Sequence, residues 1–79
     1  MHNVRDEKIL IQFGKNLKRL RNEAGITQEE LSYRSELALS QIARIETGKI
    51  NTTICTVYTI AKALEVNAGK LFIENLVKS

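Results

Sequence analysis

The segment from Thr27-Gln28-Glu29-Glu30-Leu31 to Ile45-Glu46-Thr47-Gly48-Lys49 decides the fold of this 79-residue chain. Thr27 is a good N-cap, and Glu30 stands three residues later, which is the spacing of a capping box at a helix start. Gly25, just upstream, suits the left-handed position that ends a preceding helix, and Gly48 suits the same position further on. The segment therefore predicts two short helices joined by a tight turn.

The second of these helices should have one apolar face and one exposed face. We expect the first helix over about residues 28–34, the turn at 35–37 and the second helix over about 38–47. Ile42 and Ile45 are three residues apart and should face the core. The opposite side then carries Leu39, Ser40, Ala43, Arg44 and Thr47. Such a pair lets one helix enter the major groove of DNA while the other holds it there.

On either side of this segment, apolar spacing predicts three further helices and no strand. A helix over about residues 5–24 carries a stripe spaced 3, 4, 3 and 4, made of Leu10, Phe13, Leu17, Leu20 and Ala24. Gly14 in this helix should cost about 1 kcal/mol relative to Ala, so close packing is expected there. A fourth helix begins near Thr53 and carries Ile54, Val57, Ile60, Ala61 and Leu64. Asn67 can cap a fifth helix over about 68–77. The expected fold is all-α, a compact five-helix bundle forming a single domain over residues 1–79.

These segments resemble the helix-turn-helix family of lambda-type phage repressors and Xre-like bacterial regulators. The resemblance rests on Thr-Gln-Glu-Glu-Leu at 27–31 and on Ser-Gln-Ile-Ala-Arg-Ile-Glu-Thr-Gly-Lys at 40–49. It extends to residues 13–21 and 56–66, and covers roughly residues 9–73. The small size also resembles the controller proteins of restriction–modification systems. The resemblance implies a lambda-repressor-like DNA-binding domain that acts as a sequence-specific transcriptional regulator.

The resemblance carries DNA contact onto particular positions of this sequence. Contact with base edges falls on Leu39, Ser40 and Arg44, and Gln41 is expected nearer the DNA backbone. Arg44 is the strongest candidate for reading guanine, because a bidentate Arg contact discriminates between bases. The alternative is that Arg44 contacts phosphate alone. Leu39 is apolar at an exposed tip and suits a thymine methyl group.

Other positions are expected to contact the phosphate backbone. Gln28, at the start of the first short helix, should bond a phosphate with help from the helix N-terminus. Residues after the second helix should flank the same strand, although Thr53 has pure capping as its alternative role. The full set of candidate DNA-binding residues is Gln28, Leu39, Ser40, Gln41, Arg44, Thr47, Lys49, Asn51 and Thr53.

The charge of the chain is unevenly distributed. The net charge of +3 is mild for a DNA-binding protein, but residues 1–26 hold six Lys and Arg against three acidic residues. A basic cluster is often an ordinary solvated face. Here it lies beside the predicted helix pair, which favours phosphate binding. The main contributors are Lys15, Lys18, Arg19 and Arg21.

Two structural features also follow from the resemblance. Arg21 and Glu46 should form an ion pair that ties the first helix to the end of the second helix of the pair. Ala38 departs from the family pattern, because relatives usually place Ser, Thr or Asp there. The start of that helix should therefore lack its usual cap.

The last predicted helix has more apolar surface than one core stripe needs. Phe72 and Leu76 are four residues apart, so together they can face the core. Ile73 and Val77 then point elsewhere. The helix is either broadly buried within the domain or forms the seam of a homodimer, for which the candidate residues are Ile73, Leu76 and Val77.

Catalysis and metal binding have little support in this sequence. The chain has one His, His2, and one Cys, Cys55, so a His-based triad, a Cys-based zinc site and an internal disulfide are excluded. There is no phosphate-binding loop, and we expect neither enzymatic activity nor a cofactor. No apolar run reaches transmembrane length and no signal peptide is present, so a cytoplasmic protein with no membrane partner is expected.

Two functional hypotheses from different classes follow. The first is a regulator that binds a near-palindromic operator in double-stranded DNA as a homodimer, with RNA polymerase as a candidate further partner. The second is an antitoxin-type module whose main work is to neutralise a partner protein. Many antitoxins also bind operators, so the two hypotheses overlap. The sequence does not specify the operator, the regulated genes or the sign of regulation.

Overall fold

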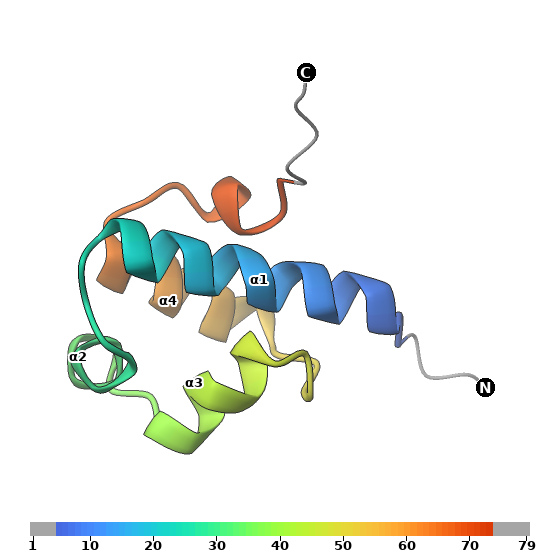
Figure 1. The fold of residues 1–79 in the computed structure, drawn as a ribbon, viewed down its shortest axis with the longest axis horizontal. Coiled ribbons are helices and arrows are strands. Elements are labelled where there is room, and N and C mark those ends of the chain that lie inside the picture. Colours follow the sequence, from blue (N-terminus) through green and yellow to red (C-terminus); the bar gives the residue numbers. More distant parts are fainter. Residues whose placement is uncertain (1–4, 74–79) are drawn as a thin grey trace.

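The computed structural model describes residues 5–73, and all regular structure in this range is helical (Figure 1). The elements are α1 (Glu7–Glu23), α2 (Gln28–Ser35), α3 (Leu39–Glu46), α4 (Ile54–Leu64) and the 3₁₀ turn η1 (Ala68–Leu71). In Figure 1, α1 runs across the middle of the molecule, with η1 on one side and α2 and α3 on the other. The predicted all-α class is confirmed. The predicted count of five helices is wrong, because the described residues form four α-helices.

The predicted fifth helix differs from the structure in type, because residues 68–71 form a 3₁₀ turn and not an α-helix. Asn67 caps it as expected, since its Oδ1 accepts from the Gly69 N–H at 2.8 Å. The turn then tightens, because the Phe72 N–H bonds to the Gly69 carbonyl three residues back rather than four. Gly69 itself disfavours an α-helix. Residues 74–79, including Leu76 and Val77, lie outside the described residues.

Helix boundaries elsewhere follow the predicted caps. Thr27 Oγ1 accepts from the Glu30 N–H at 3.0 Å, and Gly25 and Gly48 have the expected positive φ angles of 73° and 74°. Glu36 ends α2 in the left-handed region at φ 62°, inside the predicted turn. Ala38 stands at the N-cap of α3 and makes no side-chain capping bond, as expected.

The core lies between α1, α2, α3 and α4 and includes η1. The largest of its fully buried apolar side chains are Leu17, Leu31, Ile42, Ile45, Ile60 and Leu71. Three predicted core positions, Ala24, Ile54 and Phe72, are wrong. Ala24 is exposed because α1 ends before it, and Ile54 is 76% exposed in the first turn of α4. Leu71, rather than Phe72, enters the core from the C-terminal segment, since Phe72 is 58% exposed.

None of the helices within residues 5–73 has the apolar length needed to cross a lipid bilayer.

At Gly14, α1 lies directly against the backbone at the end of α3. A Cβ atom there would lie 2.6 Å from the carbonyl oxygen of Glu46 and nearer still to that of Ile45. Both neighbours are backbone atoms at the end of α3, so they can yield only if the helix moves. The close packing expected from the sequence is confirmed.

Substituting Gly14 by Ala should therefore destabilise the fold, although Ala is the better helix former. We expect a loss of about 1–3 kcal/mol, because overpacking against backbone outweighs a helix preference of about 1 kcal/mol. Urea denaturation followed by circular dichroism measures this change. Lys15→Ala, at the adjacent exposed position, is the control and should be nearly neutral. A Gly14→Ala protein as stable as the parent would show that α1 and α3 pack less tightly.

Candidate nucleic-acid interface

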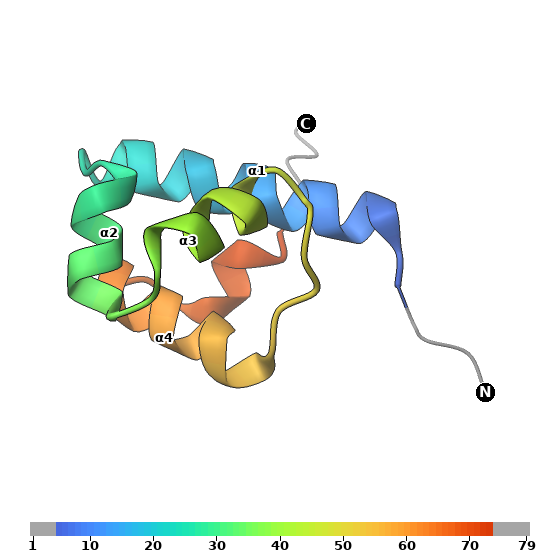
Figure 2. The same ribbon diagram turned by 90° about the horizontal axis from the view of Figure 1, so that it is seen from below.

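α3 is oriented by its buried face. Ile42 and Ile45 are 0% and 1% exposed, so the rotation of this helix about its axis is determined by the core. Figure 2 shows α3 flanked by α2 and by the loop that leads to α4. The residues predicted to meet DNA bases lie on the solvent side, where Leu39, Ser40 and Arg44 are exposed. Gln41 is half-buried.

The segment after α3 carries the other candidate contacts at the surface. Lys49, Asn51 and Thr53 are all exposed. Thr53 Oγ1 accepts from the Thr56 N–H at 3.2 Å, so its capping role is confirmed. The Thr47 hydroxyl donates to the Ala43 carbonyl at 3.0 Å, so it is turned back onto the end of α3.

Gln28 lies at the start of α2 and is already bonded within the protein. Its Nε2 donates to Glu46 Oε1 at 2.9 Å, and the side chain is half-buried. A side-chain amide has two N–H donors, so a phosphate contact would use the second one. The structure thus joins Gln28 to the Arg21–Glu46 pair, a contact that the sequence did not predict.

Arg21 and Glu46 form a buried bidentate ion pair. Arg21 Nε lies 2.6 Å from Glu46 Oε2, and Nη2 lies 3.1 Å from Oε1. The two side chains are only 10% and 3% exposed. Arg21 Nη1 also donates to the Ile26 carbonyl at 3.0 Å. The hydrogen bond with Glu46 is the main cause that raises the pKa of Arg21, against burial, which lowers it. The pair links α1, the start of α2 and the end of α3, which are the elements that place α3.

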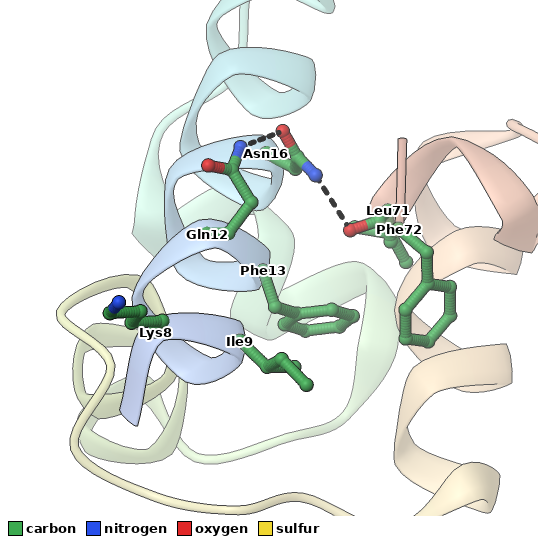
Figure 3. Close-up of a pocket in the computed structure, with 7 residues that line it drawn as sticks. All are labelled: Lys8, Ile9, Gln12, Phe13, Asn16, Leu71 and Phe72. Atoms are coloured by element: carbon green, nitrogen blue, oxygen red, sulfur yellow. Dashed lines mark hydrogen bonds between the residues drawn. The ribbon is translucent and has the colours of Figure 1, made fainter. Parts of the chain in front are cut away.

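Asn16 is a structural residue that the sequence analysis missed. It is 2% exposed, and its Nδ2 donates to the carbonyls of Leu71 and Ile73, both at 2.9 Å. Its Oδ1 accepts from Gln12 Nε2 at 3.2 Å, and Figure 3 shows this chain of amides beside Leu71. Asn16 therefore holds the C-terminal segment on α1. A polar residue three positions after Phe13, within the apolar stripe, was the available signal.

Large apolar side chains are exposed on α1, on α4 and on the C-terminal segment. Ile9, Ile54, Phe72 and Ile73 are between 57% and 76% exposed, and we call these four residues the C-terminal apolar surface. Ile9 and Phe72 line one hollow, shown in Figure 3, and Ile54 joins them in lining a second. The Phe72 ring packs on Phe13, with ring centroids 5.2 Å apart. Of the predicted dimer residues, the structure describes Ile73 alone.

Residues 5–73 contain no group of three or more His, Cys, Asp or Glu side chains that could hold a metal ion. Cys55 is exposed on α4. α3 with its flanking loop and the C-terminal apolar surface are two exposed features of the described chain that could contact a partner.

Comparison with known proteins agrees with this geometry. A family model described as a helix-turn-helix domain matches residues 14–75. The HTH-type transcriptional regulator y4dJ of Sinorhizobium fredii is 43% identical over 58 residues, which is 73% of this chain and 75% of that protein.

Solved structures of restriction–modification controller proteins have the same fold. C.AhdI from Aeromonas hydrophila is 33% identical with a TM-score of 0.78, over 80% of this chain and 96% of that one. A tetramer of the controller C.Esp1396I, solved with its natural 35 base-pair operator, is 38% identical with a TM-score of 0.75, over 81% and 84% of the two chains. This chain belongs to the helix-turn-helix family and is an Xre-like helix-turn-helix regulator.

Proposed function

We propose that this protein is a sequence-specific transcriptional regulator that binds its operator by inserting α3 into the major groove of DNA. The observation that carries the proposal is the outward face of α3. Leu39, Ser40 and Arg44 are exposed on a helix whose rotation is determined by fully buried isoleucines. Side chains on a rigid helix can be aligned with base edges at little cost in conformational entropy.

The residues around α3 can hold it against the phosphate backbone. Lys49 and Asn51 follow α3 at the surface, and Thr53 lies at the start of α4. Gln28 and Thr47 are already bonded within the protein, so each would offer its remaining hydrogen-bonding capacity. Phosphate contacts fix register without reading sequence, which leaves discrimination to α3.

The operator is bound by a homodimer whose seam is the C-terminal apolar surface. Ile73, predicted for this role, is 57% exposed. Phe72, the residue before Ile73, shares a hollow with Ile9 and Ile54, which adds exposed apolar area next to this position in the sequence. Leu76 and Val77 lie beyond the described residues. The partner that covers this surface is a second copy of this chain. A domain of this size reads few base pairs, and two copies double the sequence that is read. The C.Esp1396I controller, 38% identical, binds its operator as a tetramer.

Arg44→Ala tests the base-reading role of α3. The substitution should weaken binding to the operator by about 1–3 kcal/mol, roughly 5- to 150-fold, and weaken binding to unrelated DNA much less. Fluorescence anisotropy with an operator selected from a random DNA pool and with an unrelated duplex measures both affinities. Lys62→Ala removes one positive charge from the last turn of α4 and serves as the control. Equal losses on the two duplexes would reduce Arg44 to a phosphate contact.

The two protein-partner hypotheses have no separate support. Neutralisation of a toxin would require a surface for another protein, and the one extended apolar surface noted above is assigned here to a second copy of the chain. A contact with RNA polymerase stays a prediction.

A further inference from the structure

Arg5, just before the start of α1, is hydrogen-bonded to the loop that follows α3. Figures 1 and 2 show this loop running beside the N-terminal half of α1. Gly48 lies so close to α1 that a Cβ atom there would come within 2.9 Å of Ile11 Cγ1. Arg5 Nη2 donates to the Lys49 carbonyl at 3.1 Å, across 44 residues of sequence. The backbone around Arg5 therefore has a defined place next to the proposed DNA-binding loop.

The contact places the Arg5 guanidinium beside the backbone of a second basic residue. Arg5 and Lys49 are both exposed, and the guanidinium is held by the backbone oxygen of the residue that carries the second charge. The nearby carboxylate of Glu7 is 72% exposed and lies 3.4 Å from Arg5 Nε, a long and solvated contact. A guanidinium has five N–H donors in a planar fork, so these two bonds leave capacity for a phosphate.

We propose that Arg5 binds a phosphate of the DNA backbone next to the one contacted by Lys49. The interface then extends from the α3–α4 loop onto the start of α1, beyond the helix-turn-helix itself. The inference rests on the proposed function. Because the Lys49 carbonyl already restrains the guanidinium, little side-chain entropy is lost when the phosphate binds.

Arg5 could instead act only as a tether for the loop, and salt dependence separates the two roles. A plot of the logarithm of the affinity against the logarithm of the salt concentration is a falling line. Its slope is about −0.9 for each phosphate that the protein neutralises. Loss of a phosphate contact reduces this slope. Loss of a tether weakens binding by misplacing the loop and leaves the number of neutralised phosphates nearly unchanged.

The experiment compares Arg5→Gln with Arg19→Gln in the full-length chain. Arg19 is a matched control because its side chain is also 41% exposed and is also paired with a glutamate, Glu23, at 3.3 Å. The sequence places Arg19 in the basic cluster of α1, but it points about 140° around α1 from Gly14, the residue that touches α3, at about 100° per residue. It is therefore turned away from α3 and already paired with Glu23, so no phosphate contact is expected of it. Each substitution removes one positive charge. Affinities for the selected operator duplex are measured by anisotropy from about 50 to 200 mM salt.

We expect Arg5→Gln to reduce the slope by about 0.9 and Arg19→Gln to leave it unchanged. Arg5→Lys should keep the slope of the parent. The proposal is overturned if Arg5→Gln retains the parental slope, or if both glutamine variants change it equally. A parent protein that shows no salt-dependent DNA binding would refute the proposed function itself, and this inference with it.

Discussion

Glu46→Ala should lower the free energy of unfolding by about 3–5 kcal/mol, because it leaves the Arg21 guanidinium buried without its carboxylate. Glu46 accepts two bonds from Arg21 and one from Gln28, and its side chain is 3% exposed. Alanine removes all three at once. The loss should appear as a lower midpoint of urea denaturation with an unchanged slope.

The control for this substitution is the exposed pair on α1. Glu23 contacts Arg19 at 3.3 Å with its side chain 62% exposed, so Glu23→Ala should cost only about 0–1 kcal/mol. The buried Arg21–Glu46 pair also ties α1 to the end of α3 and, through Gln28, to the start of α2. Operator affinity of Glu46→Ala, measured where the variant is still folded, should therefore fall as well. A Glu46→Ala protein within 1 kcal/mol of the parent, as set by the exposed control, would show that the pair contributes little.

Ile73→Asp should convert the protein to folded monomers and weaken operator binding by about 10²–10⁴-fold, the gain that linking two binding modules typically provides. The side chain is 57% exposed in the single chain, so the charge should change the stability of the domain little. In a dimer the same charge would be buried in an apolar seam, where it is costly.

Analytical ultracentrifugation and the same anisotropy titration check this result. Tyr33→Asp is the matched control, since Tyr33 is an 82% exposed hydrophobic residue on α2, outside the C-terminal apolar surface. It should leave the assembly state unchanged. The dimer proposal would fail if the parent sedimented as a monomer at tens of micromolar and bound a single half-site tightly.

The parts of the fold that the sequence predicts correctly depend on local chemistry. Thr27, Gly25 and Gly48 mark helix ends through their own backbone preferences, and the structure shows those ends. Ile42 and Ile45 define the buried face of α3 by spacing alone, so the exposed face follows. The sequence alone therefore predicts the outline of the helix pair.

The features that escaped prediction depend on contacts between distant segments. η1 stops short of an α-helix where Asn16, 55 residues away, takes the Leu71 carbonyl. Ile54 has the spacing of a core residue but lies in the first turn of α4, where no neighbouring helix covers it. The bond from Gln28 to Glu46 and that from Arg5 to Lys49 likewise join residues that sequence spacing does not relate.

The most direct test of the central proposal is selection of bound sequences from a random pool of double-stranded DNA, using the full-length protein at moderate salt. We expect enrichment of a near-palindromic site whose half-sites lie about one helical turn apart, roughly 34 Å. Arg44→Ala should relax the preference at one symmetric pair of positions in that site. A pool that remains random after repeated rounds, although the protein is folded and the DNA is retained only at low salt, would contradict sequence-specific recognition by α3.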